Sequence, residues 1–466
     1  MAFPHPQPMT SYWLSAAADL ANHRTTESLP TEADVVIIGS GFSGSAAAYF
    51  LATQSRTGNV KCPSTVILEA RQVCSGATGR NGGHMKPDTY YSAAEAYRNY
   101  GPKVADELIQ FETQQMFDVK RLVDAERIDC DFEMTRAFDV FTDQQTADSV
   151  LQTHEEMKSK GFSFPDDLHV ITDPKRAEQI SGVRGAKAAL SFTAGSVWPY
   201  KMVTHLLRRS IEEGVNLQTT TPVQQILGNK ADGRWTVKTN RGNIVAKKII
   251  MASNAYTAAL FPEFKEKIVP VRGVVCRISV PEGTGKRAPH LNNTYALRFN
   301  PEHFDYLISR SDGSIVVGGA DRCAVEKQDY WYGNTDDSQL IPETEKYFTR
   351  YMQRMFNGWE DSKAHITDIW SGIMGWSSDS MPFVGKLPGK PGIFITAGFT
   401  GHGMPRILGC SKALVELVQS DGETIDMNTK NGIPTPYLLT EARLEDKTNN
   451  IISYARNVTS NLKSRL

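Results

Sequence analysis

Ala33–Met85 is the stretch of sequence that decides the fold: residues 39–44 read GSGFSG, an acidic residue follows at Glu69, and residues 75–84 read SGATGRNGGH. Residues 34–38 form a short, apolar, β-branched run, which is typical of a buried parallel strand. A glycine-rich turn directly after such a strand predicts a βαβ unit that binds a dinucleotide. The alternative is a βαβ unit that binds no ligand.

Each glycine of the turn has its own role in this prediction. Gly39 allows the tight turn, Gly41 lets the backbone approach a pyrophosphate, and Gly44 permits close packing of helix on strand. The turn leads through Phe42 and Ser43 into a helix expected over residues 43–53, which are rich in Ala and Leu. The free N–H groups and the dipole at the start of this helix favour phosphate.

A second apolar run, residues 65–68, ends at Glu69, which Ala70 and Arg71 follow. A carboxylate at this position can accept hydrogen bonds from ribose hydroxyls and would repel a 2′-phosphate. The polar residues 55–64 indicate a loop insertion, which accounts for the slightly long spacing between Gly44 and Glu69.

Composition limits the other functions that are open to the chain. The chain has 466 residues, 40% of them hydrophobic and 22% charged, with a formal net charge of −1. This length suits two or three domains, and the charge supplies no global field for nucleic acid or an anionic membrane. No apolar run is long enough for a transmembrane helix, and the N-terminus lacks a secretory signal. The six cysteines are scattered, so we expect reduced thiols in an intracellular protein and no metal site.

The chain ends at Ser464-Arg465-Leu466, a conservative variant of the Ser-Lys-Leu peroxisomal address. This predicts a peroxisomal protein that an import receptor recognises through its tail. A chance basic and apolar tail on a cytoplasmic protein is the alternative.

Further along the chain, the pattern predicts a helix over residues 202–211, a hairpin over 234–246 and a buried strand over 248–252. Residues 267–373 alternate as in an antiparallel sheet. A strand over 392–397, the turn GFTGHG at 398–403 and a helix over 404–418 follow. The nucleotide-binding unit therefore resumes near the C-terminus.

Three motifs together are specific: the N-terminal GSGFSG, MASNA at residues 251–255 and GFTGHGM at 398–404. They resemble the FAD-dependent family of amine and amino-acid oxidases that includes glycine oxidase and D-amino-acid oxidase. The likeness is greatest to γ-glutamylputrescine oxidoreductase and covers nearly the whole chain. Further matching stretches are SYW at 11–13, GATGRNGG at 76–83, RIDCD at 127–131, NAY at 254–256, WSG at 370–372 and MP at 381–382.

The resemblance implies an α/β fold of the glutathione-reductase type. A Rossmann-like FAD-binding domain, with a parallel sheet and helices, would combine residues 30–90, 196–262 and 372–425. An α+β substrate domain with an antiparallel sheet would combine 91–195 and 263–371. Residues 1–29 would form an N-terminal arm and 426–466 a C-terminal extension.

Several residues are expected near FAD beyond the first turn. The SGATGRNGGH stretch would pass close to the isoalloxazine ring, and Gly401–Gly403, opening the last helix, would face the flavin edge that becomes negative on reduction. His402 would add to this if it is protonated, or would only pack beside the ring. FAD is expected to be non-covalent, with a covalent link to His84 as an alternative. The predicted residues are Thr78, Arg80, Asn81, Gly82, Gly83, His84, Val223, Ser253, Asn254, Gly401, His402, Gly403 and Met404.

Substrate contacts are expected from the antiparallel sheet and the turns that face the flavin. An arginine such as Arg298, Arg310 or Arg322 can hold a carboxylate bidentately, although no spacing singles one out. The candidates for substrate contact are Tyr306, Arg310, Trp376 and Trp198. The predicted catalytic residues are His402, His84, Tyr306, Trp376 and Arg310.

The function expected from the resemblance is an FAD-dependent amine oxidase: hydride leaves the carbon next to the amine nitrogen, and O₂ becomes hydrogen peroxide. A dehydrogenase with another electron acceptor is the first alternative, because SIVVGG at 314–319 lacks the lysine that sarcosine oxidase uses with oxygen. An NAD(P)H-dependent FAD hydroxylase and a non-catalytic flavin-binding module are further alternatives.

Overall fold

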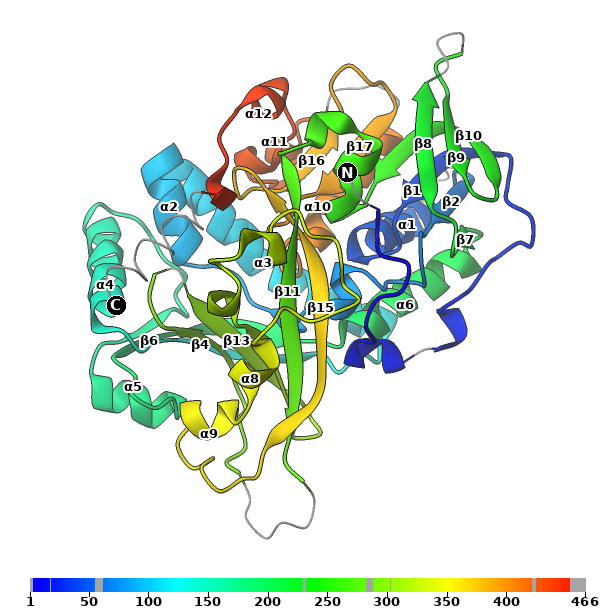
Figure 1. Cartoon of the computed structure of the whole chain (residues 1–466). Coiled ribbons are helices and arrows are strands. Elements are labelled where there is room, and N and C mark those ends of the chain that lie inside the picture. Colours follow the sequence, from blue (N-terminus) through cyan, green and yellow to red (C-terminus); the bar gives the residue numbers. More distant parts are fainter. Residues whose placement is uncertain are drawn as a thin grey trace.

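The computed structural model describes residues 3–16, 18–54, 62–228, 232–281, 288–301, 303–420 and 425–452. Two large sheets organise this part of the chain, and the long strands β11 (Ile268–Ser279) and β15 (His365–Ser377) run side by side between the two halves of the molecule (Figure 1). The predicted C-terminal tail, Ser464–Leu466, lies outside the described residues.

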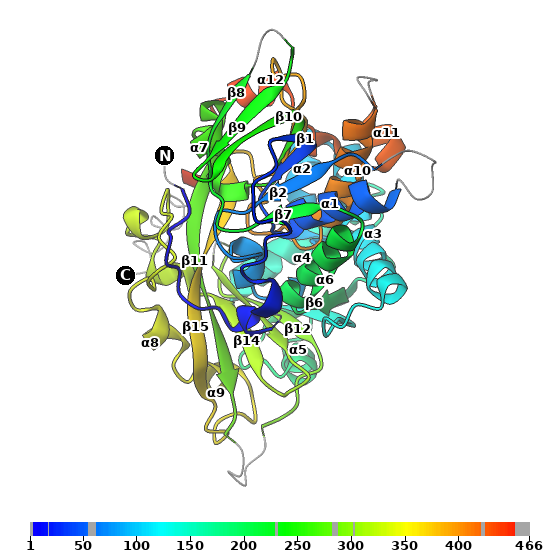
Figure 2. The same ribbon diagram turned by 90° about the vertical axis from the view of Figure 1, so that its right-hand side faces the viewer.

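The first sheet has a parallel centre in the order β17-β10-β1-β2-β7, and β16 joins β17 antiparallel. Figure 2 shows β8, β9 and β10 extending from it as an antiparallel ribbon. The mixed α/β fold and the predicted strand–turn–helix at the N-terminus are therefore confirmed. Its strands are β1 (Glu32–Ile38), β2 (Thr65–Leu68), β7 (Asn216–Gln218), β8 (Val223–Gly228), β9 (Trp235–Thr239), β10 (Gly242–Met251), β16 (Phe383–Lys386) and β17 (Ile393–Ala397).

Strand β10 corrects one detail of the sequence prediction. A hairpin strand and a separate buried strand were expected, but residues 242–251 form one continuous strand. Its first half pairs antiparallel with β9, and most of its length pairs parallel with β1. The exposed Lys247 in the middle interrupts the apolar pattern without interrupting the strand.

The second sheet has the order β15-β11-β14-β13-β12-β4-β6-β3, with β5 paired to β6. The antiparallel pairing predicted for residues 267–373 is confirmed for β11, β12, β13, β14 and β15. The other edge of β12 pairs parallel with β4, which comes from outside that range. The remaining strands are β3 (His84–Met85), β4 (Glu133–Phe141), β5 (His169–Ile171), β6 (Ala188–Ser196), β12 (Thr294–Arg298), β13 (Phe304–Ser309) and β14 (Ile315–Gly319).

Helices cover both sheets. Several begin at a recognisable signal, such as Pro102 at the start of α3. Their bounds are α1 (Phe42–Gln54), α2 (Tyr91–Tyr100), α3 (Pro102–Glu126), α4 (Gln144–Ser159), α5 (Pro174–Ser181), α6 (Pro199–Glu212), α7 (Thr257–Leu260), α8 (Thr344–Phe348), α9 (Tyr351–Met355), α10 (Ile407–Gln419), α11 (Met427–Asn431) and α12 (Glu441–Glu445).

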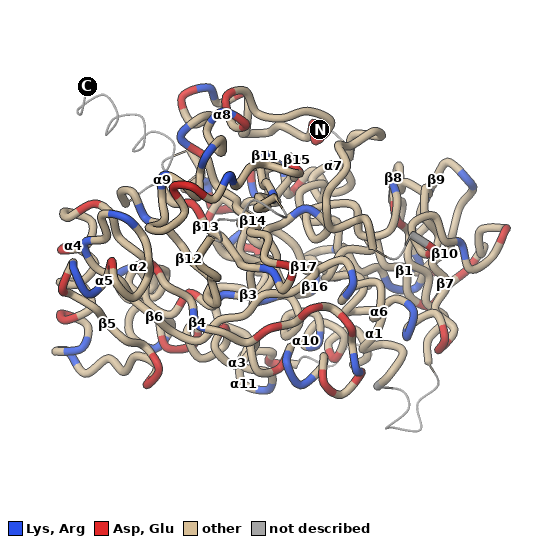
Figure 3. Tube along the Cα trace, turned by 90° about the horizontal axis from the view of Figure 1, so that it is seen from below, with Lys and Arg blue, Asp and Glu red and all other residues tan. Residues whose placement is uncertain are grey.

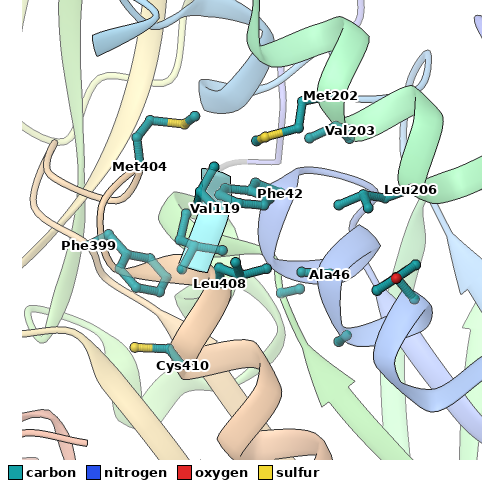
Figure 4. Close-up of a cluster of buried hydrophobic side chains, with 14 of the residues drawn as sticks. Phe42, Ala46, Val119, Met202, Val203, Leu206, Phe399, Met404, Leu408 and Cys410 are labelled. Carbon is teal, nitrogen blue, oxygen red and sulfur yellow. The ribbon is translucent and has the colours of Figure 1, made fainter. Parts of the chain in front are cut away.

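Helix α1 is buried between α6 and α10, and Figure 4 shows the side chains that enclose it. Ala46 is fully buried beside Leu206 of α6 and Leu408 of α10. Small side chains on α1 let the flanking helices approach closely, so the helix that carries the glycine turn is fixed on all sides. Other labelled members of this cluster are Phe42, Val119, Met202, Val203, Phe399, Met404 and Cys410.

Charged residues are spread over the whole molecule, and Figure 3 shows Lys and Arg interspersed with Asp and Glu along the trace. All six cysteines are free thiols. In the described ranges, no helix is long and apolar enough to cross a membrane, and no group of three or more His, Cys, Asp or Glu side chains is placed to hold a metal ion.

The predicted domain ranges stay a prediction. Their boundaries do not coincide with the sheets at two places. Strand β3 lies in the range predicted for FAD binding but pairs with β6 of the second sheet. Strand β15 crosses the predicted boundary between residues 371 and 372.

Candidate active site

One cavity of about 430 Å³ extends from the glycine turn to the second sheet. The turn at residues 39–43 and Glu69 line one end, while Tyr306 of β13 and Trp376 of β15 line the other. Between them lie the stretch around Thr78 and the turn Thr400–Met404. A dinucleotide whose pyrophosphate lies at α1 and whose adenosine ribose lies at Glu69 would therefore direct its other half toward the second sheet.

The glycine turn has the geometry that its sequence predicts. Gly39 has φ +108°, and a Cβ there would lie 2.7 Å from the carbonyl oxygen of Ala252. A Cβ on Gly44 would lie 1.9 Å from the carbonyl oxygen of Gly39, so this glycine allows the helix to touch the turn. A Cβ on Gly41 would lie no closer than 3.3 Å to any atom, the nearest being Thr78 Oγ1. The backbone of Gly41 is therefore open to the cavity.

Glu69 already holds the turn in place. Its Oε2 accepts hydrogen bonds from the backbone N–H and the hydroxyl of Ser40, at 3.0 and 2.7 Å, and its Oε1 accepts from Arg71 N at 2.9 Å. A carboxylate has about four acceptor positions, so little capacity remains for a ribose hydroxyl. The geometry gives Glu69 a structural role in addition to the predicted ribose contact.

Arg71 and Arg80 line the cavity, but their guanidinium groups bind the protein itself. Arg71 pairs with the buried Asp337 at 3.0 Å, and Arg80 Nε lies 3.5 Å from the same carboxylate. Arg80 also donates to the carbonyl oxygens of Ser75, Met9 and Ser371. Burial lowers the pKa of Arg80 to about 10, which leaves it charged at neutral pH. These contacts fasten the N-terminal arm and β15 to the cavity wall.

Asn254 joins three segments at the far side of the turn. It follows β10 with φ +42°, and its Oδ1 accepts from Gly398 N at 2.9 Å. A Cβ on Gly375 of β15 would lie 2.7 Å from this oxygen. Ser253 and Asn254 line the cavity as predicted, and Val223 of β8 lies beside them in its lining.

Tyr306 is held between two glycines at the sheet end of the cavity. A Cβ on Gly82 would lie 2.3 Å from its Cε2, and one on Gly318 would lie 2.2 Å from its Oη. Burial raises the pKa of Tyr306, so the phenol stays protonated. Gly82 and Gly83 do not line the cavity themselves. Because they lack side chains, the Tyr306 ring can lie against Gly82 and the carbonyl oxygen of Val197 against Gly83.

His402 lies in the cavity wall and binds a buried glutamate. Its Nε2 is 2.8 Å from Oε2 of Glu112, a residue of α3 that is 2% exposed. Glu112 also accepts from Arg406 Nε at 2.6 Å and from Asp88 N at 2.7 Å. Burial raises the pKa of Glu112, but Arg406 and His402 outweigh this effect and hold the pKa below its usual value. Glu112 is therefore a carboxylate that faces His402.

His84 does not line the cavity. Its Nε2 is buried and finds no hydrogen-bond partner among the described residues. Burial, with Lys86 and His402 nearby, lowers the pKa of His84 well below its usual value, so the imidazole is neutral. Its ring centre lies 6.3 Å from that of Tyr306.

The arginines considered as carboxylate clamps lie elsewhere. Arg310 pairs with Asp131 at 2.6 Å. Four residues of extended chain separate Arg310 from Tyr306, which corresponds to about 13 Å. Arg298 pairs with Asp139 at 3.3 Å, and Arg322 stacks over Tyr347. Trp198 also lies outside the cavity, where its ring packs at 5.3 Å from the Arg310 guanidinium.

The last helix begins later than predicted. Helix α10 starts at Ile407, so Gly401–Gly403 form a turn and not the N-terminus of the helix. Pro405 explains the difference, because a proline disfavours helical backbone at the residue before it, Met404. The turn still lines the cavity, and a Cβ on Gly401 would lie 3.1 Å from Met374 Sδ.

Sequence reasoning missed several lining residues. Tyr256 is the most informative, because its hydroxyl is buried and has no hydrogen-bond partner in the described part of the chain. Tyr256 belongs to the NAY stretch, which supported the resemblance to the oxidase family but predicted no role for this tyrosine. Asp337 and Glu112, which organise the cavity wall from behind, have no local sequence signal. An unpaired donor such as Tyr256 Oη fits a polar cofactor in this cavity.

Fold and cavity together define the class: an enzyme that binds a dinucleotide at a βαβ turn, with a second sheet closing over the far end of the cavity. The chain belongs to the FAD dependent oxidoreductase family (DAO), which matches residues 34–417. It is therefore an FAD-dependent oxidoreductase, as the sequence predicted.

Two relatives match over most of the chain. The probable oxidoreductase OrdL of Rhizobium meliloti is 24% identical over 406 residues, which cover 86% of this chain and 87% of the relative. The γ-glutamylputrescine oxidoreductase of Escherichia coli is 23% identical over 430 residues and 90% of each chain. Among solved structures, glycine oxidase from Geobacillus kaustophilus superposes with a TM-score of 0.68 at 18% identity, over 88% of this chain and 99% of the other. This last likeness confirms the fold.

Proposed function

We propose that the protein is an FAD-dependent amine oxidase. The observation that carries the proposal is the single cavity that joins the dinucleotide turn to Tyr306, Trp376 and His402. Relatives named γ-glutamylputrescine oxidoreductase, glycine oxidase and dimethylglycine dehydrogenase support a C–N bond as the one oxidised.

The residues that would hold FAD are those of the cavity lining. Backbone N–H groups at Gly41 and Ser43 would receive the pyrophosphate, because the first N–H groups of a helix have no partner within it. Tyr256 Oη would donate to a polar atom of the cofactor. The Gly401–Met404 turn would lie beside the isoalloxazine ring, which supplies the two-electron oxidant once bound.

The substrate would lie between this turn and the second sheet. Tyr306 and Trp376 offer aromatic surface for an amine and its carbon chain, and both line the cavity. Gly82 and Gly318 fix the Tyr306 ring from both sides, so its position does not depend on the substrate.

Oxygen is proposed as the electron acceptor, with hydrogen peroxide as a product. An amine dehydrogenase with another acceptor is the second candidate, since relatives are named both oxidase and dehydrogenase.

The test is anaerobic titration of the FAD-loaded protein with a panel of primary amines, secondary amines and amino acids, followed by admission of air. Loss of the oxidised-flavin absorbance on adding an amine is the expected result, and peroxide formed in equal amount would support the oxidase. Reoxidation only by artificial acceptors would favour the dehydrogenase. A flavin that no amine reduces would refute the proposal.

A further inference from the structure

An amine reaches an enzyme near neutral pH mainly as its ammonium ion. Alkyl amines have a pKa near 10, so about one molecule in a thousand is neutral at pH 7. Oxidation at the neighbouring carbon requires the neutral form, because the nitrogen lone pair assists the departing hydride. An enzyme that takes up the ammonium ion therefore gains from a group that accepts its proton inside the cavity.

His402 is placed to be that group. Its ring lines the cavity, its side chain is 31% exposed, and its Nε2 is bound to Glu112 at 2.8 Å. No hydrogen bond from the described residues reaches its other nitrogen, Nδ1. If Nε2 carries the proton that Glu112 accepts, then Nδ1 holds a lone pair that can face the cavity.

The setting of Glu112 fixes this arrangement. Four donors converge on its carboxylate, which is 2% exposed. Besides His402, the donors are Arg406 Nε at 2.6 Å, Asp88 N at 2.7 Å and Tyr437 Oη at 3.4 Å. A carboxylate held from several sides orients an imidazole and stabilises its cation, as in other histidine–carboxylate pairs.

Other carboxylates in the cavity lining are less suited to accept a proton. Glu69 accepts three hydrogen bonds from the glycine turn and its surroundings. Asp321 lies 3.0 Å from His303 Nδ1 and accepts from Arg322 N. As residue types, an unperturbed imidazole is a stronger base than an unperturbed carboxylate by about two pKa units.

We propose that His402 and Glu112 form a proton-accepting pair, in which His402 Nδ1 takes the proton from the substrate ammonium ion. This inference rests on the proposed function. The N–H bond of the ammonium ion breaks, its electron pair stays on nitrogen, and an Nδ1–H bond forms. His402 becomes an imidazolium ion whose charge Glu112 balances. The neutral amine left in the cavity is the form that would donate a hydride, since FAD would supply the two-electron oxidant when bound.

Several charged groups lie around His402. Glu112 contacts it from α3, and Asp88 and His84 approach from the segment before α2. Burial raises the pKa of Asp88, but Lys86, His402, a hydrogen bond from Ser92 and Arg298 lower it to about 2, so Asp88 adds a second negative charge. Arg406 and Tyr437 reach His402 through Glu112.

The first experiment uses the wild-type holoenzyme. Ring nitrogens of ¹⁵N-histidine-labelled protein are observed by NMR, and the signals missing from His402→Asn identify His402. We expect an unprotonated Nδ1 and a protonated Nε2 without ligand. Adding an amine with no hydrogen on its α-carbon, which cannot be oxidised, should protonate Nδ1. A His402 that stays neutral with this amine bound would overturn the proposal.

The second experiment measures the rate of flavin reduction against pH in single turnovers. His402→Asn should lower this rate on the order of 100-fold at pH 7 for an ordinary alkyl amine. The loss should shrink about tenfold per pH unit as the amine itself deprotonates, and it should nearly vanish for a fluorinated amine that is already neutral. Glu112→Gln should slow reduction in the same pH-dependent way.

His205→Asn is the matched control, because His205 also faces a glutamate, Glu126 at 3.9 Å, but lies outside the cavity. It should leave the pH profile unchanged. A His402→Asn loss that is equal at all pH values and for both amines would overturn the inference and leave the proposed function standing. A wild-type flavin that no amine reduces would instead refute the proposed function, and this inference with it.

Discussion

Arg71 Nη1 donates to both carboxylate oxygens of Asp337, at 3.0 Å each, across 266 residues of sequence. Their side chains are 8% and 1% exposed, and Arg80 Nε lies 3.5 Å from the same carboxylate. Two arginines in the wall of the FAD cavity therefore share one buried negative charge. The loop that carries Asp337 therefore supplies one counter-charge to two arginines of this wall.

Replacing Asp337 by Asn should leave both guanidinium groups buried without a counter-charge. Breaking a buried ion pair in this way costs about 3–5 kcal/mol, which urea unfolding followed by tryptophan fluorescence will measure. The control is Glu360→Gln, which removes a carboxylate from the half-exposed Arg184 and should cost about 0–1 kcal/mol. Equal losses in the two variants would show that the Asp337 pair does not stabilise the fold.

Gly44→Ala should abolish FAD binding. The new Cβ would lie 1.9 Å from the carbonyl oxygen of Gly39, and neither backbone segment can move without opening the turn. The ratio of flavin to protein absorbance in the purified variant should fall to near zero. Gly161→Ala is the control: it strains a φ of +82° in open space and should cost about 1 kcal/mol without loss of FAD. A Gly44→Ala protein that keeps its flavin would contradict the close packing.

Asp305 should make stability fall as pH rises from 4 to 6. Burial raises its pKa from 3.8 to about 6, while Tyr347, Tyr351 and the Ala320 N–H hydrogen-bond the carboxyl group. The folded protein thus keeps a proton that the unfolded chain has lost, and this contribution is complete below pH 4 and gone above pH 6. It amounts to about 3 kcal/mol.

Asp305→Asn should remove this pH dependence, since the amide does not titrate and the two tyrosine hydroxyls can rotate to accept its N–H groups. The measurement is the unfolding free energy of variant and wild type at pH 4 and pH 7. From pH 4 to pH 7, the unfolding free energy of the variant should rise relative to that of the wild type. Parallel pH profiles would mean that Asp305 keeps an ordinary pKa.

Tyr256→Phe should weaken FAD binding and spare the fold. Its hydroxyl has no partner in the described part of the protein, so its loss removes a contact only when the cofactor is bound. One hydrogen bond of about 1 kcal/mol corresponds to a roughly fivefold higher Kd, measured by titrating apoprotein with FAD. Tyr49→Phe, which removes a 2.7 Å hydrogen bond to Glu126 outside the cavity, should leave the Kd unchanged. Identical Kd values for Tyr256→Phe and wild type would exclude this contact.

Local patterns in the sequence were enough for the parts of the site that depend on neighbouring residues. The spacing of Gly39, Gly41 and Gly44 specifies a turn, because Gly39 and Gly44 meet backbone atoms within a few residues or at the adjoining strand and Gly41 faces the cavity. Tyr306 and Trp376, two of the candidates expected from the antiparallel sheet and the flavin-facing turns, both line the cavity. The start of α10 was predicted three residues early, although Pro405 was a usable signal.

Long-range pairs could not be predicted in this way. Glu112 and His402 are 290 residues apart, and nothing in the helical stripe of α3 distinguishes Glu112 from a surface glutamate. Arg310 was proposed to bind a substrate carboxylate because of its residue type. Its position directly after β13 instead places it away from the cavity, beside Asp131. Only the tertiary arrangement supplies that information.

The order in which the cavity is completed has a consequence for synthesis of the protein. Its walls include Phe3 and Ile407, and β17, which pairs with β10, begins only at Ile393. The glycine turn is therefore synthesised long before the strand that completes the first sheet. FAD supply in the cell can then limit how much chain matures only after β17 has been translated.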